Sequence, residues 1–361
     1  MRQRYIGIIE GEGIGKEIVP IAVECLRILN KVFRLQLQLL TLEKKQGFTN
    51  FYHQIVNFFE LIKKQEGAIL RGPLKGEIAY PIRRKFDFFY KLIFLEAIPE
   101  LQDISPLKEH VRSQIKVLLV RENNMGLYHG LHGWKEGQNG KIAFQHAEYL
   151  ENKVEQIAKV AFLLASKRRC SLSLFIKYAA LNEIGKLWVQ TFERIQSEEY
   201  PTVSLSVMHP DRGAGELFSR AADFDVVVTL DVDGDILSDH LVALLNGSRA
   251  VGCSGEFDGT GFASYQTLHG EAADIAGTGK ANPVGMVLAA AMMLECSFGL
   301  SREAAILKQA VRRVLGQGFR TVDIATRNSI IMGTQEMGDL IVNSLHTLCA
   351  TEVTTLCQQQ P

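Results

Sequence analysis

The chain has 361 residues and a mass of 40.3 kDa, which predicts two domains or one large α/β domain. Its 40 basic and 40 acidic residues cancel, so the composition gives no support for a polyanion-binding surface and we expect no nucleic-acid partner. Apolar runs such as residues 286–294 fall short of the ~20 residues that cross a bilayer, and the N-terminal residues lack a signal-peptide core. We therefore expect a cytoplasmic protein without a membrane partner.

Short apolar runs alternate along the chain with longer segments of helical period. Helices are predicted from Lys16 to Phe33 and over residues 148–168, where apolar residues recur at helical spacing. The runs typical of strands cover residues 5–10, 66–72, 116–122, 171–176, 203–208 and 225–230. This alternation favours the α/β fold class, with parallel or mixed sheets layered with helices.

The first strand runs directly into a glycine turn, IIEGEGIGKE at residues 8–17. The turn is similar to a dinucleotide fingerprint, but its third glycine, Gly15, comes one place early and Lys16 stands where that fingerprint requires glycine. By itself the segment predicts a tight turn between a strand and a helix.

The segment VLLVRENNMGLYHG at residues 117–130 places Arg121 and Tyr128 just beyond a predicted buried strand. Strand ends of this kind carry the functional residues of many α/β proteins. An arginine there can bind a carboxylate through two hydrogen bonds, and a tyrosine can transfer a proton. The alternative for Arg121 is an ion pair at the surface.

Residues 224–241, FDVVVTLDVDGDILSDHL, lead from a buried strand into four acids, Asp231, Asp233, Asp235 and Asp239. If a helix begins there, Asp235 and Asp239 lie on one face, since they are four residues apart. Neighbouring carboxylates need a compensating cation, and oxygen ligands favour Mg²⁺ or Mn²⁺. The alternative is a set of helix N-terminal acids that the helix dipole stabilises.

A glycine-rich loop at residues 268–285, LHGEAADIAGTGKANPVG, includes His269, Asp274 and Asn282. Glycines allow the backbone to approach a ligand closely, so the loop is suited to holding a nucleotide. It is equally typical of a connector with tight turns.

Together with GTQEMGDLI at residues 333–341, these segments resemble, in the same order, the motifs of the isocitrate and isopropylmalate dehydrogenases, a family of metal-dependent β-decarboxylating dehydrogenases. The resemblance extends from about residue 5 to about residue 345. It implies a two-domain isopropylmalate dehydrogenase-like fold, with layered helices, mixed sheets and an active site in the cleft between domains. Residues 1–96 and 247–361 would form a large nucleotide-binding domain and residues 97–246 a small central domain that dimerises.

The resemblance also implies roles for individual residues. Asp235, Asp239 and a second subunit's Asp211 match the acids that hold Mg²⁺ or Mn²⁺. Tyr128 and Lys177 match the catalytic pair, with Lys177 acting in the neighbouring subunit's site. The remaining matches are Arg83 and Arg121 for substrate carboxylates, and His269, Gly270, Asp274, Ile275 and Asn282 for the cofactor. Asp274 followed by Ile275 indicates NAD, because a carboxylate accepts ribose hydroxyl bonds and repels a 2′-phosphate.

Several positions depart from the family's pattern. Ile93 stands where a second arginine of the motif around Arg83 is expected, and Asp231 stands where an asparagine is expected. The loop at residues 71–82 is short and lacks the substrate-contacting serine and asparagine of isocitrate enzymes. Counting from one flanking anchor places Lys177 at the catalytic lysine, whereas counting from the other places Tyr178 there.

The resemblance therefore predicts an NAD-dependent oxidative decarboxylation of a small 2-hydroxy acid with a β-carboxylate, in a homodimer with shared active sites. An isopropylmalate-like or malate-like substrate ranks above isocitrate because of the altered loop at residues 71–82. The departures favour an alternative, a non-catalytic homologue that acts as a regulatory or partner subunit.

Overall fold

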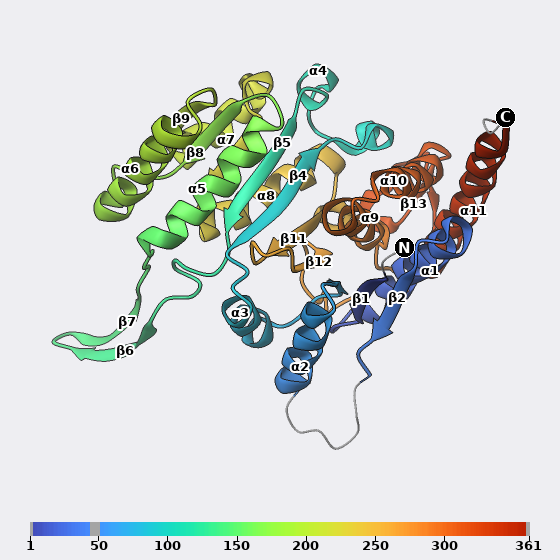
Figure 1. Ribbon diagram of the computed structural model, residues 1–361, viewed down its shortest axis with the longest axis horizontal. Coiled ribbons are helices and arrows are strands. Elements are labelled where there is room, and N and C mark those ends of the chain that lie inside the picture. The colour runs from blue at the N-terminus through green and yellow to red at the C-terminus, as the bar shows by residue number, and fades with distance from the viewer. Residues whose placement is uncertain (1–2, 44–50, 359–361) are drawn as a thin grey trace. The chain divides into compact units, whose positions relative to one another are not determined.

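The computed structural model describes residues 3–43 and 51–358, with side chains through residue 352, and the chain forms two compact units (Figure 1). The first comprises Met1–Ala79, Ile98–Pro106 and Val242–Pro361, and the second Tyr80–Ala97 and Leu107–Leu241. The predicted boundaries near residues 96 and 246, and the predicted roles of the two domains, stay predictions.

The first unit contains a mixed sheet covered by helices. The strands of the sheet are β1 (Arg4–Ile9), β2 (Leu37–Thr41), β3 (Ala68–Arg71), β11 (Cys253–Phe257) and β12 (Ala263–Thr267). Two further short strands, β13 (Phe319–Arg320) and β14 (Ile330–Ile331), pair with each other. Its helices are α1 (Gly15–Phe33), α2 (Phe51–Lys64), α9 (Val284–Phe298), α10 (Ser301–Gly316) and α11 (Thr334–Gln358), with short turns η1 (Pro99–Ile104), η3 (Arg249–Val251) and η4 (Val322–Ile324). The strand order is β2-β1-β3-β12-β11, parallel except for the pair β11–β12.

The predicted buried runs form the core of this unit. In β1, Ile6, Ile8 and Ile9 are buried, and α9 is apolar nearly all round because it packs on β3, β11 and β12 on one side and on α1 and α10 on others. The predicted helix from Lys16 is confirmed, with its first residue at Gly15. Within the described residues, no helix combines the length and the apolar content needed to cross a membrane.

The second unit also contains a mixed sheet, in the order β4-β5-β10-β8-β9, with β4 antiparallel to β5 and the other pairs parallel. Its strands are β4 (Tyr90–Glu96), β5 (Lys116–Glu122), β6 (His132–Gly137), β7 (Gly140–Gln145), β8 (Ser171–Phe175), β9 (Ser204–Met208) and β10 (Val226–Thr229). Its helices are α4 (Glu109–Arg112), α5 (Glu151–Ser166), α6 (Asn182–Glu199) and α7 (Pro210–Ser219), with the turn η2 (Ala221–Asp223). Helices α3 (Gly76–Lys85) and α8 (Asp231–Asn246) have residues in both units.

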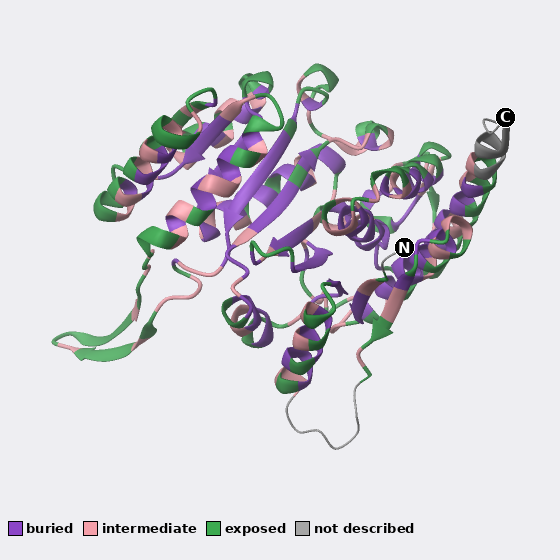
Figure 2. Ribbon diagram, in the orientation of Figure 1, coloured by how far each residue is buried: buried purple, intermediate pink, exposed green. Residues whose placement is uncertain are grey.

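The central strands of the second unit are buried (Figure 2), and aromatic side chains pack with them in its core. Phe162 of α5 packs on Phe192 of α6, which in turn stacks on Trp188. The strands predicted over residues 116–122, 171–176, 203–208 and 225–230 are confirmed as β5, β8, β9 and β10. The expected α/β class with mixed sheets is therefore correct.

Candidate active site

Three residues that sequence reasoning singled out meet in the second unit, and we call them the Asp235 cluster: Arg121, Tyr128 and Asp235. Arg121, near the end of β5, donates a hydrogen bond from Nη1 to Asp235 Oδ1 in α8. Tyr128 donates its hydroxyl to the other carboxylate oxygen, Oδ2, at 3.3 Å. The Arg121 guanidinium also lies over the Tyr128 ring, 5.9 Å from its centroid. Arg121 thus forms an ion pair, as the alternative interpretation expected, but its own side chain is buried and not at the surface.

Two further cations act on Asp235. Arg83 is mostly buried and lies over the Tyr80 ring at 5.2 Å. Lys91 in β4 is directly opposite Arg121 in the β4–β5 register and is also buried. Sequence reasoning missed Lys91, although it lies two residues from Ile93 and therefore on the same face of the strand. A lysine so near the missing arginine was the available signal.

These charges set the ionisation of the cluster. Burial acts to raise the pKa of Asp235, but the nearby Arg121 and Lys91 outweigh it and the net shift is downward. Burial, and then the Asp235 carboxylate, raise the pKa of Tyr128 to about 12. At neutral pH the cluster therefore pairs an ionised acid with a tyrosine that keeps its proton.

Two buried carboxyl groups lie beside this cluster. Asp231, the first residue of α8, accepts the backbone N–H of Tyr128 at 3.0 Å and the hydroxyl of Tyr149 at 3.3 Å. Glu122, the last residue of β5, accepts the backbone N–H groups of Asn124 at 2.7 Å and Met125 at 2.6 Å. Sequence reasoning missed Glu122 and Tyr149, because nothing in the local pattern indicates that they contact the loop of Tyr128.

The residues predicted to act across a dimer lie together on the same chain. Lys177 follows β8 and donates Nζ to Asp211 Oδ1 of α7 at 2.7 Å, and both side chains are largely exposed. Tyr178, the alternative to Lys177, packs its ring edge-on against His209 at 4.5 Å. The structure of one chain thus gives Lys177, and not Tyr178, the ionic contact with Asp211.

The predicted metal acids are only partly assembled in one chain. Asp235 and Asp239 are one turn apart on α8, as their spacing predicted, and α8 begins at Asp231. Across residues 3–43 and 51–358, no group of three or more His, Cys, Asp or Glu side chains gathers as a metal site. The two carboxylates suit a hard divalent cation, but a third acidic ligand would have to come from elsewhere.

The residues predicted for the cofactor lie in the first unit. His269 is buried, with Nδ1 2.9 Å from the carbonyl oxygen of Gly270. Asn282 is buried and donates to Asp323 at 3.1 Å while accepting the N–H of Val284 at 3.0 Å. Asp274 is exposed and Ile275 is half-buried, so the loop presents its carboxylate to solvent.

The glycine-rich loop is held by the first glycine turn. Glu17, in the first turn of α1, accepts the backbone N–H groups of Gly277 at 2.7 Å and Gly279 at 3.1 Å. Ile14 donates its backbone N–H to the carbonyl oxygen of Glu271 at 3.0 Å. Gly13 has a φ of +56°, and a Cβ there would overlap the carbonyl oxygen of Glu271. The turn that departs from the dinucleotide fingerprint therefore acts as the support of the glycine-rich loop.

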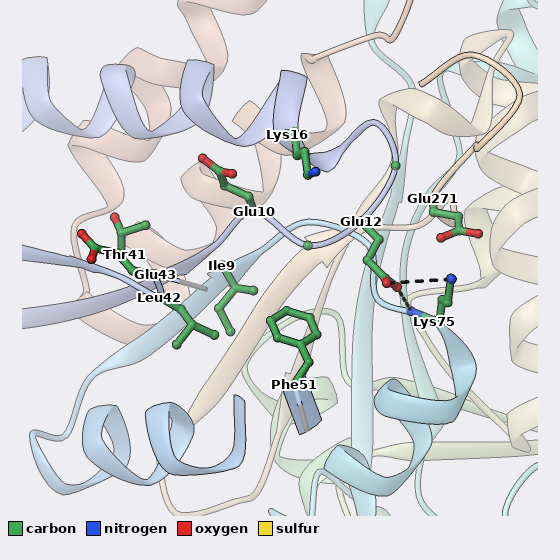
Figure 3. A pocket seen from close by; sticks show the side chains of 12 residues that line it. Ile9, Glu10, Glu12, Lys16, Thr41, Leu42, Glu43, Phe51, Lys75 and Glu271 are labelled. Atoms are coloured by element: carbon green, nitrogen blue, oxygen red, sulfur yellow. Dashed lines mark hydrogen bonds and ion pairs between the residues drawn. The ribbon is translucent and has the colours of Figure 1, made fainter. Parts of the chain in front are cut away.

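A cavity of about 570 Å³ opens beside the same turn (Figure 3). Its charged lining consists of Glu10, Glu12, Glu43 and Glu271 with Lys16 and Lys75. Glu12 accepts the backbone N–H of Lys75 at 3.1 Å. Since carboxylates outnumber lysines, this cavity is poorly suited to the phosphates of a dinucleotide, and it contains none of the predicted cofactor residues.

Comparison with known proteins agrees with the motifs. The family model described as isocitrate/isopropylmalate dehydrogenase matches residues 5–341. The chain is 31% identical to a 3-isopropylmalate dehydrogenase of Helicobacter hepaticus, over 95% of this chain and 99% of that protein. It is 36% identical to the 3-isopropylmalate dehydrogenase of Acinetobacter baylyi, over 95% and 99% of the two chains.

Among solved structures, isocitrate dehydrogenase from Methylococcus capsulatus matches with a TM-score of 0.81 and 26% identity, over 95% of this chain and 99% of that chain. The family model and the names of these relatives indicate a dehydrogenase of the isocitrate/isopropylmalate type. The chain belongs to the isocitrate/isopropylmalate dehydrogenase family.

Proposed function

We propose that this chain catalyses the NAD-dependent oxidative decarboxylation of a 2-hydroxy acid with a β-carboxylate, with 3-isopropylmalate-like or malate-like acids preferred to isocitrate. The observation that carries the proposal is the Asp235 cluster, in which a buried arginine, an ionised acid and a protonated tyrosine are in contact. The names of the relatives support a hydroxy-acid substrate.

In this proposal the chain's residues bind and orient the substrate. Arg83 and Arg121 hold substrate carboxylates, and Lys91 adds a third positive charge on the same side of the cluster. Lys177 from a second copy takes the hydroxyl proton as the C–H hydride leaves. After the C–C bond to the β-carboxylate breaks and CO₂ departs, Tyr128 returns a proton to the carbon. The high pKa of Tyr128 keeps that proton in place until the step occurs.

The proposed cofactors are NAD and Mg²⁺ or Mn²⁺. When bound, they supply a hydride acceptor and a Lewis acid that polarises the substrate oxygen. Asp235 and Asp239, with Asp211 from a second copy, would hold the metal, and the oxygen donors of all three suit a hard cation. His269, Gly270, Asp274, Ile275 and Asn282 would hold NAD.

We propose a homodimer with shared active sites, in the cytoplasm. The β6–β7 hairpin supports dimerisation, because it extends from the second unit with almost every side chain exposed (Figure 2). Trp134 is 72% exposed and Leu131, next to the hairpin, 66% exposed. Apolar side chains in such an arm favour burial against another chain.

The test is NADH absorbance on purified protein with Mn²⁺ and a panel of isopropylmalate, isocitrate, homoisocitrate, malate and tartrate, repeated with NADP. We expect turnover of one acid with NAD, lost in Asp235→Asn. Asp274→Lys should weaken NAD binding in a fluorescence titration, since it replaces the carboxylate proposed for the ribose; unchanged NAD affinity would refute that role.

The second candidate function is a non-catalytic homologue used as a regulatory or partner subunit. The fully buried Ile93 favours this candidate, because it stands where the family's second arginine is expected and has no charge to bind a substrate carboxylate. If a folded dimer oxidises none of the acids in the panel, that result supports this candidate.

A further inference from the structure

Two carboxyl groups are buried beneath the loop that carries Tyr128. Glu122 and Asp231 have relative exposures of 0% and 1%. The loop, residues 123–131, leaves β5 directly after Glu122, and α8 begins at Asp231. The two acids come from elements far apart in sequence, and the charge of Asp231 acts on Glu122.

Three backbone N–H groups of this loop donate hydrogen bonds to the two carboxyls. Glu122 Oε1 accepts those of Asn124 and Met125, and Asp231 Oδ2 accepts that of Tyr128. At Gly126, which has a φ of +71°, a Cβ would lie 2.7 Å from Asp231 Oδ1. The loop therefore packs directly on Asp231, and the direction of the Tyr128 main chain depends on that carboxylate.

The surroundings do not neutralise two negative charges. The titratable and charged groups that face Glu122 are Asp231, Arg121 and Tyr149, and the guanidinium of Arg121 already pairs with Asp235. Among the described residues, Glu122 Oε2 is buried and has no hydrogen-bond partner. Leaving a buried carboxylate oxygen in this state costs more than leaving a neutral carboxyl.

We propose that Glu122 and Asp231 form a carboxyl pair in which Glu122 carries a proton at neutral pH, and that this pair positions Tyr128 for proton transfer. Glu122 is the protonated member, because its Oε2 is buried and has no hydrogen-bond partner among the described residues, whereas both oxygens of Asp231 accept hydrogen bonds. The catalytic part rests on the proposed function; the proton and the loop contacts do not. Burial, and then Asp231, raise the pKa of Glu122 to about 8, which agrees with this assignment.

The first experiment measures the proton without any substrate. Infrared difference spectra between pH 6 and pH 10 should show a protonated carboxyl band that disappears on raising the pH in wild-type protein and is absent in Glu122→Gln. Glu193→Gln, which changes an exposed glutamate on α6, is the matched control and should keep the band. A wild-type protein without the band, or a Glu122→Gln protein that retains it, overturns the protonation of Glu122.

The second experiment measures positioning. Hydrogen exchange at the amides of Asn124 and Met125 should fall below the intrinsic rate more strongly above pH 8 than below it in wild type, because ionised Glu122 accepts their N–H groups more strongly. Glu122→Gln, whose neutral amide imitates the protonated acid, should not show this change. Asp231→Ala should lower kcat about 10- to 100-fold with little change in KM, and Asp231→Asn should restore most of it. Equal exchange profiles and an unchanged kcat overturn the positioning role.

The outcomes separate this inference from the proposed function. If the infrared band and the exchange behave as expected but no acid is oxidised, the carboxyl pair stands and the proposed function fails. If an acid is oxidised but Asp231→Ala leaves kcat unchanged, the proposed function stands and the pair is not a positioning device.

Discussion

The two predicted sites of this chain are held in opposite ways. In the second unit, the Asp235 cluster consists of charged side chains that contact one another, with Arg121 buried and the cations of Arg83 and Lys91 nearby. In the first unit, the glycine-rich loop is held through its backbone, by Glu17 and by the close approach of Gly13.

This contrast predicts different sensitivities. A change of charge in the Asp235 cluster leaves a buried ion without its partner, which is costly. A change of side chain in the glycine-rich loop lowers the free energy of unfolding little unless it adds a Cβ where the backbone leaves no room. The following substitutions test the contrast from the largest expected effect to the smallest.

Asp235→Asn should give the largest effect, a fall in turnover of about 10²- to 10³-fold or more, because it removes the charge that orients Arg121 and replaces one of the two carboxylate oxygens that accept from Arg121 and Tyr128. The measurement is NADH formation with the preferred acid, with circular dichroism to verify folding. Glu193→Gln is the control and should retain full activity. Wild-type turnover by Asp235→Asn would mean that the cluster is not catalytic.

Gly13→Ala and Gly277→Ala form a matched pair in the first unit. Both glycines have positive φ, +56° and +77°, but a Cβ overlaps the Glu271 backbone only at Gly13 and meets nothing within 4 Å at Gly277. We expect the free energy of unfolding to fall by about 3 kcal/mol for Gly13→Ala and about 1 kcal/mol for Gly277→Ala. Urea denaturation measures both, and equal losses would contradict the close approach.

His129 gives the smallest effect and depends on pH. Burial, with the charges of Arg83 and Arg84, lowers its pKa to about 4. Between pH 6.5 and pH 4 the unfolded chain therefore binds a proton that the folded chain does not, so stability falls as the pH falls. For this partly exposed ring we expect a loss of about 1 kcal/mol, present in wild type and absent in His129→Gln, from denaturation at pH 7 and pH 4.5. Equal losses would assign the effect to other groups.

Much of the fold was predictable from local patterns. The apolar runs at residues 116–122 and 225–230 form β5 and β10, since long β-branched and leucine-rich runs are buried in parallel sheets on both faces. The spacing of Asp235 and Asp239 placed both on one helix, because helical residues four apart share a face. The family resemblance also assigned Arg121, Tyr128 and Asp235 to one active site, although it did not predict that they contact one another.

The rest of the site depends on pairings between distant segments. Lys91 acts on Asp235 only because β4 lies antiparallel to β5 and brings it opposite Arg121. In the sequence, Glu122 is indistinguishable from an ordinary acid at the end of a strand. Its burial depends on the loop at residues 123–131 and on Asp231 from α8. No local signal reports such a neighbour.

The sequence by itself determined the fold class, the family and the residue types at the site, because periodicity and motif spacing are local properties of the chain. The tertiary structure decided which charges face one another, and therefore which acids are ionised. The ionisation of an acid depends on its burial and on its distance from charges in other elements. These two factors change the free energy of the charged form far more than the neighbouring residues in sequence do.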